Sequence, residues 1–306
     1  RMLILLLIIF IGLNMGIGLY APIIAYILTP AILLLIFGFI FLKYVYPDFI
    51  KTNLVRDNNL FKKISKYSLF IMITSSGVMV LGHTDSLLLT YFKGVAAVGL
   101  YSVALPTAKL LLYFPNAFGS ILLPVTSELW TKKEDYLLKY GVESLYKYSM
   151  IIVVPMGLIM LTYSEIIITL LFSKDYISAV FALKILVVGM LFATLHAIHS
   201  NFFQGIGKPQ IHSKIIIFGA IFNLIGNIIL IPFYGIYVAA ITTSFVYFVM
   251  VVVGLYNIKK FINLNFPFKD WGKILFSGVI LVIIINFLRG ILKINIIIEI
   301  IIVLLI

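Results

Sequence analysis

The sequence of 306 residues is dominated by apolar side chains, with 63% hydrophobic and 11% charged residues and a mean hydropathy of +1.18. Soluble domains carry about 25% charged residues, so a soluble enzyme is excluded. In a membrane protein a net charge of +12 indicates lysine and arginine residues in cytoplasmic loops. No nucleic-acid partner is therefore expected. The absence of cysteine excludes disulfides, cysteine-ligated metals and thiol nucleophiles.

Ten apolar segments are predicted as membrane helices; a bilayer span needs about 20 mostly apolar residues, and two of the ten are shorter than this. Their ranges are 2–14 (short), 20–43, 66–91, 97–126, 143–163, 177–203, 213–231, 235–256, 272–289 and 294–306 (short). The predicted fold class is therefore all-α, a polytopic helical membrane protein with about ten transmembrane helices.

Lysine and arginine are unevenly distributed between alternate loops, as expected if cytoplasmic loops are rich in these residues. The basic-rich loops contain, among others, Arg1, Lys63, Lys133, Lys208 and Lys260, and the opposite loops hold Lys93, Lys174, Arg289 and Lys293. This alternation predicts a multi-pass protein of the cell membrane with both ends of the chain on the cytoplasmic side.

Both ends of the sequence are expected to lie within a longer protein. The chain opens directly into an apolar run without a signal-peptide n-region or cleavage site, and it stops inside a short apolar run. A shift of about 214 residues aligns segment 20–43 with segment 235–256. The shift matches Tyr20 with Tyr234, Ala25 with Ala239, Ile27 with Ile241 and Thr29 with Thr243. We interpret the two segments as the sixth helices of two related lobes.

Several motifs occur in a fixed order between residues 60 and 260. They are TDSLLL at 84–89, FKG at 92–94, VGLYS at 98–102, LPVTSE at 123–128, FQGIGKP at 203–209 and IPFYG at 231–235, together with Asn223 and Asn227. In these motifs the chain resembles the polysaccharide flippases of the multidrug/oligosaccharidyl-lipid/polysaccharide exporter superfamily.

The resemblance implies two bundles of six helices around a central cavity, followed by two further helices. Residues 1–50 would then be the last two helices of a truncated first lobe, and 51–65 a cytoplasmic linker. Residues 66–256 would form a complete six-helix second lobe, and 257–306 the two C-terminal helices, the last of them truncated.

The resemblance also implies a transporter rather than an enzyme, with no cofactor. The expected activity is translocation of a polyprenyl-linked oligosaccharide across the cytoplasmic membrane by alternating access, for surface polysaccharide assembly. Its expected partners are this lipid-linked oligosaccharide, the bilayer and other polysaccharide-assembly proteins. The alternatives are a cation-coupled multidrug or small-molecule exporter of the same superfamily and a flippase for a lipid-linked peptidoglycan precursor.

Polar residues recur at helical spacing along segment 97–126, on one face of the predicted helix. They are Ser102, Pro106, Lys109, Tyr113, Asn116 and Ser120. Lys109 lies roughly 18 Å from the start of this helix, too deep for easy snorkelling. We predict a substrate-binding face made by Ser102, Lys109, Tyr113 and Asn116. In the alternative interpretation, Lys109 is neutralised by Asp85.

Segment 66–91 carries a second polar stripe, from which His83 and Ser86 are predicted to contribute to substrate binding. Asp85 lies about 200° around the helix from His83. It is a candidate site for a coupling ion, and its alternative role is a hydrogen bond within the lobe. His196 and His199 share a face of segment 177–203, but no third ligand is evident in the sequence, so no metal site is expected.

Overall fold

The computed structural model describes the chain except residues 19, 50–56, 266 and 293–306. The predicted short helix 294–306 and Lys293 therefore lie outside the described residues. The chain divides into two compact units, Arg1–Phe61 and Lys62–Ile306, and each is described here by itself. Throughout the described ranges the secondary structure is helical and contains no strand, so the predicted all-α class is confirmed.

The first unit consists of two packed helices, α1 (Met2–Asn14) and α2 (Tyr20–Ile40), with α2 continuing as a π-helical segment over Phe41–Val45. Both agree with the predicted segments 2–14 and 20–43. Gly12 of α1 is buried against Ala21, and a methyl group added to Gly12 would collide with the side chain of Ala21. Small residues of this kind allow membrane helices to approach closely.

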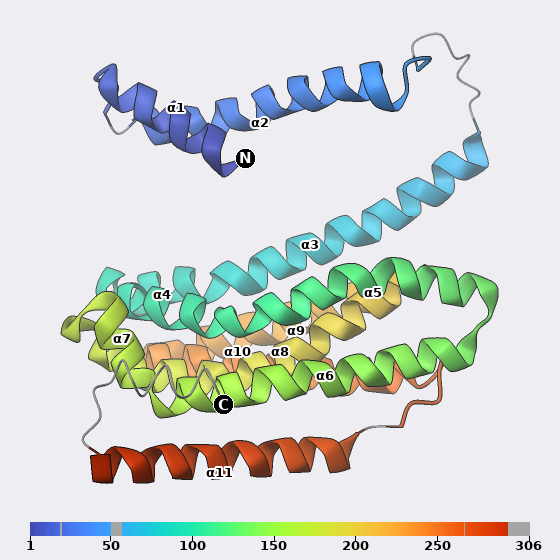
Figure 1. Cartoon of the computed structure of the whole chain (residues 1–306). Coiled ribbons are helices and arrows are strands. Elements are labelled where there is room, and N and C mark those ends of the chain that lie inside the picture. The colour runs from blue at the N-terminus through green and yellow to red at the C-terminus, as the bar shows by residue number, and fades with distance from the viewer. Residues whose placement is uncertain (19, 50–56, 266, 293–306) are drawn as a thin grey trace. The chain divides into compact units, whose positions relative to one another are not determined.

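The second unit is a bundle of helices that begins with α3, whose first residues belong to the preceding unit (Figure 1). The helices are α3 (Asn58–Lys93), α4 (Val95–Lys109), α5 (Tyr113–Lys132), α6 (Asp135–Thr162), α7 (Ser164–Phe172), α8 (Val180–Gly205), α9 (Pro209–Tyr234), α10 (Ile236–Ile258) and α11 (Phe268–Leu292). Over the described part of both units, seven helical segments are long and apolar enough to cross a membrane.

The predicted helix 97–126 is present as one apolar span, Val95–Lys132, but it is not a continuous α-helix. A 3₁₀ turn over Leu110–Leu112 separates α4 from α5. The proline at position 115 accounts for this turn, because it lacks the N–H that would bond the carbonyl of Leu111, and its ring crowds that carbonyl. Lys109, the centre of the predicted polar stripe, is thus the last residue of α4.

A short helix, α7, follows α6 where the sequence predicted only an outer loop. Its nine residues form an apolar run too short to cross a bilayer, which is why it was not counted as a span. A 3₁₀ segment over Lys174–Ala179 then leads into α8. Ser173 begins this segment in the left-handed region, with a φ of 100°, and its Oγ accepts a hydrogen bond from the backbone N–H of Asp175.

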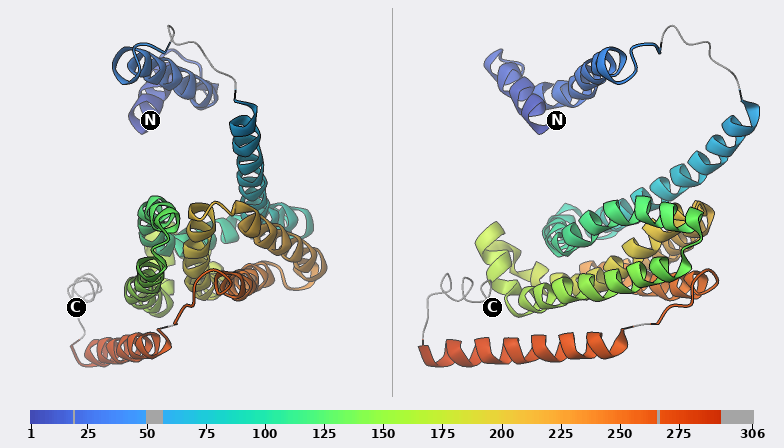
Figure 2. Two further views of the ribbon diagram at one scale, coloured as in Figure 1. Left: turned by 90° about the vertical axis from the view of Figure 1, so that its right-hand side faces the viewer. Right: turned by 45° about the vertical axis from the view of Figure 1, so that its right-hand side comes forward.

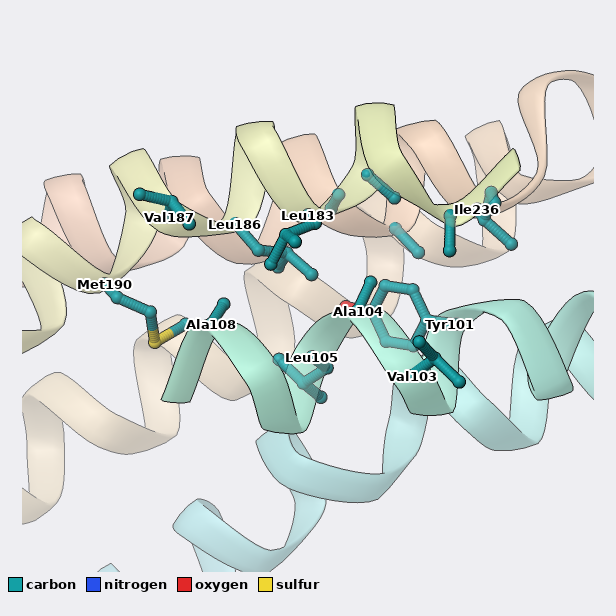
Figure 3. Close-up of a cluster of buried hydrophobic side chains, with 14 of the residues drawn as sticks. Tyr101, Val103, Ala104, Leu105, Ala108, Leu183, Leu186, Val187, Met190 and Ile236 are labelled. Carbon is teal, nitrogen blue, oxygen red and sulfur yellow. The ribbon is translucent and has the colours of Figure 1, made fainter. Parts of the chain in front are cut away.

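Helix α8 is the centre of the second unit and packs against α4, α5, α6, α9 and α10 (Figure 2). In one core cluster Leu183, Leu186 and Met190 of α8 meet apolar side chains of α4, including Leu105 (Figure 3). On another side of α8, a methyl group at Gly189 would collide with Ser244 of α10. These close contacts make α8 and its neighbours a tightly packed scaffold.

The last described helix, α11, lies along α6 and coincides with the predicted segment 272–289. Lys147 Nζ of α6 lies 3.1 Å from Asp270 Oδ2, and Glu143 Oε1 accepts a hydrogen bond from the backbone N–H of Asn265 at 2.5 Å. Tyr146 and Trp271 also meet edge to face, with ring centroids 6.4 Å apart. Polar contacts therefore fix the start of α11 to the first half of α6.

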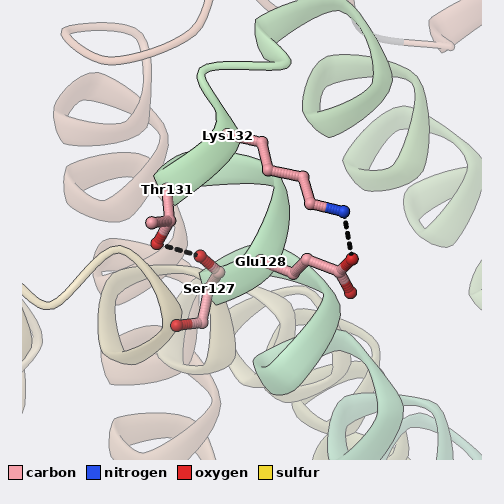
Figure 4. Close-up of polar contacts among 4 residues, drawn as sticks. All are labelled: Ser127, Glu128, Thr131 and Lys132. Atoms are coloured by element: carbon pink, nitrogen blue, oxygen red, sulfur yellow. Dashed lines mark hydrogen bonds and ion pairs between the residues drawn. The ribbon is translucent and has the colours of Figure 1, made fainter.

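The LPVTSE motif occupies the last turns of α5 (Figure 4). Lys132 Nζ pairs with Glu128 Oε1 at 2.6 Å, and Thr131 Oγ1 donates a hydrogen bond to the carbonyl oxygen of Ser127 at 2.7 Å. Both charged side chains are largely exposed, and an exposed ion pair contributes little to stability. The helix ends at Lys133, which adopts the left-handed conformation with a φ of 59°.

The predicted orientation can be tested by labelling, because the chain has no native cysteine. Single cysteines replacing Lys63 and Lys260 should react with a membrane-impermeant maleimide only from the cytoplasmic side. Cysteines replacing Lys93 and Lys174 should react only from outside. Nearly all of the labelling of each cysteine should occur when the reagent is added on the expected side, because basic loops are retained in the cytoplasm. Labelling of Lys260→Cys from outside would overturn the orientation.

Candidate functional site

A buried hydrogen-bond network surrounds Asp85, which is 1% exposed. Its Oδ2 accepts hydrogen bonds from Tyr101 Oη of α4 at 2.5 Å and from Thr243 Oγ1 of α10 at 2.7 Å. Its Oδ1 accepts one from Asn227 Nδ2 of α9 at 2.6 Å. The carboxylate of Asp85 on α3 is thereby bonded to residues of three other helices. This is the geometry expected for the alternative role of Asp85, a hydrogen bond within the lobe.

The network continues between α9 and α10. Asn227 Nδ2 also lies 3.1 Å from Asn223 Oδ1, and Thr242 Oγ1 lies 2.5 Å from Asn227 Oδ1 and 2.9 Å from the carbonyl oxygen of Val238. Together with Asp85 these residues gather carboxylate, amide, hydroxyl and backbone oxygen atoms in a buried place. Oxygen donors of this type suit a hard cation, so this is the part of the described structure where a coupling ion could be held.

Asp85 does not form an ion pair with Lys109 in this structure. Lys109 is partly buried at the end of α4, and within the described residues its amino group has neither an ion pair nor a hydrogen bond. The hydrogen bonds to Asp85 come instead from uncharged side chains. The alternative interpretation, a direct pair between Lys109 and Asp85, is therefore not the arrangement observed.

The other polar side chains predicted on segment 97–126 lie on an exposed face of α4 and α5. Ser102, Tyr113 and Asn116 are all exposed, and Tyr113 is 70% exposed. None of them points into the core of the second unit. Because this unit consists mainly of membrane-spanning helices, an exposed polar face of this kind suggests contact with water or with a polar ligand.

On α3, His83 and Ser86 lie together in a surface groove of about 490 Å³. Thr84 and Thr90 also line it, among apolar residues of the same helix. His83 is exposed, whereas Asp85 on the opposite side of α3 is buried. The predicted separation of these two residues onto different faces of one helix is confirmed.

Polar contacts also join the first half of α3 to α8 and α9. Tyr67 Oη donates a hydrogen bond to the carbonyl oxygen of Gln204 at 3.2 Å. Ser213 Oγ lies 2.8 Å both from the carbonyl oxygen of Phe70 and from Thr74 Oγ1. Among the candidate membrane spans of the second unit α3 is the least buried, and these hydrogen bonds attach its first half to α8 and α9.

Three buried histidines converge between α8 and α9. The ring of His196 lies 5.0 Å from that of His212 and 6.3 Å from that of His199, measured between centroids. The structure thus supplies a neighbour, His212, that sequence spacing did not reveal. However, no group of three or more His, Asp or Glu side chains in the described ranges is arranged to hold a metal ion.

The sequence interpretation missed most of the partners of Asp85. Tyr101 lay within the VGLYS motif, and Asn223 and Asn227 were noted as part of the resemblance but not as partners of Asp85. The spacing of the two asparagines by four residues places them on one helix face. Because buried amides on a membrane helix require polar partners, that spacing was the signal that could have identified them.

Comparison with known proteins identifies the family. Residues 2–181 match the family described as polysaccharide biosynthesis protein. The chain belongs to this family. This match confirms a prediction made from the sequence motifs. The chain is related to the polysaccharide flippases of the multidrug/oligosaccharidyl-lipid/polysaccharide exporter superfamily.

Among curated proteins, the chain is 38% identical over 281 residues to the uncharacterised membrane protein MJ1068 of Methanocaldococcus jannaschii, covering 92% of this chain and 55% of the relative. It is 24% identical over 220 residues to the probable low-salt glycan biosynthesis flippase Agl15 of Haloferax volcanii, covering 72% of this chain and 47% of that protein. The chain therefore spans about half the length of these relatives.

A solved structure of the lipid II flippase MurJ, in an inward closed conformation, has the same fold. The TM-score is 0.71 at 18% sequence identity, over 99% of this chain and 64% of that chain. At this identity the likeness concerns the fold. It agrees with the multi-pass helical architecture of this member of the polysaccharide biosynthesis family.

Proposed function

We propose that the protein carrying this chain translocates a polyprenyl-linked oligosaccharide across the cell membrane by alternating access, for surface polysaccharide assembly. Family membership and the likeness to a glycan flippase support this proposal. The observation that carries it is the exposed polar face around Lys109 on a membrane-spanning helix pair. Such a face is costly against lipid tails, and a sugar diphosphate supplies the hydroxyl groups and negative charge that it would bind.

In this proposal the substrate-binding residues are Ser102, Lys109, Tyr113 and Asn116 of α4 and α5, with His83 and Ser86 of α3. Lys109 attracts the diphosphate, and the hydroxyl and amide groups bind sugar hydroxyls. Both ends of the chain face the cytoplasm, and other polysaccharide-assembly proteins act before and after the translocation step.

We also propose Asp85 as the coupling-ion site. The single carboxylate of Asp85 matches the charge of one monovalent cation. Hydroxyl oxygens of Tyr101 and Thr243 lie against it, and side-chain oxygens of Asn223, Asn227 and Thr242 lie further along the same network. The hydrogen bonds that now satisfy Asp85 would be exchanged for bonds to the ion. Because the network joins α3 to α4, α9 and α10, binding at Asp85 would change the attachment of α3.

Complementation tests the substrate class. The gene that encodes this chain, with any coding sequence upstream of it, is expressed in a host that lacks its surface-polysaccharide flippase. We expect surface polysaccharide to return and the lipid-linked precursor to stop accumulating. A host depleted of its lipid II flippase and a host lacking its drug exporters serve as parallel strains. Rescue of only the lipid II strain would indicate a flippase for a lipid-linked peptidoglycan precursor instead. Increased resistance to cationic dyes alone would indicate a multidrug exporter.

A further inference from the structure

A groove between α9 and α10 lies away from both polar stripes. It has a volume of about 370 Å³ and is lined by Ile211, Lys214, Ile215, Phe218, Val253 and Asn257. Apart from Lys214 and Asn257 these side chains are apolar. Lys214 is exposed and Phe218 is 55% exposed, so the groove opens at the surface of the second unit beside the exposed apolar face of α9.

Positive charge gathers at one end of this groove. Lys214 lies in the lining, and Lys260 Nζ lies 3.3 Å from Oδ1 of Asn257, another lining residue. Lys260 Nζ also lies 4.5 Å from the centroid of the Tyr256 ring. Lys208, which precedes the first residue of α9, lies over the ring of Phe261.

This charge has no acidic counterpart nearby in the sequence. Between Asp175 and Asp270 the chain contains no aspartate or glutamate. Within the described residues Lys214 forms neither an ion pair nor a hydrogen bond, and Lys260 contacts only an amide and a ring. Two lysines therefore lie at the mouth of an apolar groove, and neither is paired with a carboxylate in the part of the chain that the structure describes.

We propose that this groove binds one anionic membrane phospholipid. The headgroup phosphate lies between Lys214 and Lys260, and an acyl chain follows the groove past Phe218. Basic pockets between membrane helices on the cytoplasmic side are suited to anionic headgroups, and the orientation predicted from the basic-rich loops puts this end of α9 and α10 in the cytoplasmic leaflet. The apolar lining selects a lipid over a free phosphate, since only a lipid also fills the groove.

Binding can be measured without transport, on the purified full-length protein in a neutral detergent. Native mass spectrometry counts bound lipid while dioleoyl-phosphatidylglycerol, dioleoyl-phosphatidylcholine or inorganic phosphate is added. We expect phosphatidylglycerol to bind at least about tenfold more tightly than phosphatidylcholine, and inorganic phosphate not to displace it. Equal binding of the two lipids, or displacement by phosphate alone, would refute the proposal.

Two variants and a control locate the site. Lys214→Gln combined with Lys260→Gln removes the cations and should weaken phosphatidylglycerol binding roughly tenfold or more, because each lysine near the headgroup contributes separately. Val253→Phe keeps the charges but fills the groove and should weaken binding as well. The control, Lys62→Gln with Lys63→Gln, removes two exposed lysines at the start of α3 and should leave binding unchanged. An equal loss in the control would mean that the lipid responds only to overall charge.

Discussion

Replacing Lys109 with alanine should abolish translocation while the protein still inserts into the membrane. An ammonium group that bonds a diphosphate contributes about 1.5–3 kcal/mol, so its loss should weaken substrate binding about 10- to 100-fold. Lys109→Arg should retain much of the activity, because arginine also binds phosphate oxygens. The measurement is translocation of a fluorescent lipid-linked oligosaccharide in proteoliposomes, scored as the fraction protected from a membrane-impermeant quencher.

Lys184 provides the matched control, since it is also a lysine within a membrane-spanning segment but is exposed on α8, away from the polar stripe. Lys184→Ala should translocate normally. The double variant Lys109→Ala with Asp85→Ala should be at least as impaired as either single variant, because the two side chains are not paired. Recovery of function in the double variant, or full activity of Lys109→Ala, would remove Lys109 from the substrate site.

Replacing Asp85 with alanine should strongly destabilise the second unit. The change leaves the donors of Tyr101, Asn227 and Thr243 without their shared acceptor in a buried place. Each buried donor that is left without an acceptor costs about 1–3 kcal/mol. We expect a lower yield of folded protein and a lower midpoint of thermal unfolding in detergent. An unchanged midpoint would show that the network does not hold α3 in place.

A second variant separates the structural role of Asp85 from ion coupling. Asp85→Asn keeps the size of the side chain and one acceptor oxygen but removes the negative charge. It should fold better than Asp85→Ala and should lose any dependence of translocation on the cation gradient. Asp135→Ala is the control, because Asp135 is exposed at the start of α6 and its loss should affect neither measurement. Gradient-dependent translocation by Asp85→Asn would assign coupling to another residue.

The sequence predicted the membrane helices well because length and apolar content determine whether a segment can span a bilayer. Segments such as 213–231 and 235–256 correspond to α9 and α10 within a few residues at most ends. The interruption between α4 and α5 was not predicted. Proline is common in membrane helices, and nothing in the local sequence distinguishes a proline that bends a helix from one that creates a 3₁₀ turn.

The candidate site was predicted only in part. Periodicity placed His83 and Asp85 on different faces of α3, since that relation depends on one helix alone. Two of the three hydrogen-bond partners of Asp85 come from positions 142 and 158 residues further along the chain, and contacts over such distances depend on how helices pack. The same reason explains why His212 was not associated with His196.

The polar contacts of α3 determine its rotational phase about its own axis. Thr74 and Asp85 are about three helical turns apart, so both point towards α9 from the same side of α3. A shift of one residue would rotate α3 by about 100° and break the contacts at both positions together. The direction of the face that carries His83 is therefore set by two distant polar contacts. Tilting of α3 as a rigid rod about either contact would move that face without rotating it about the helix axis.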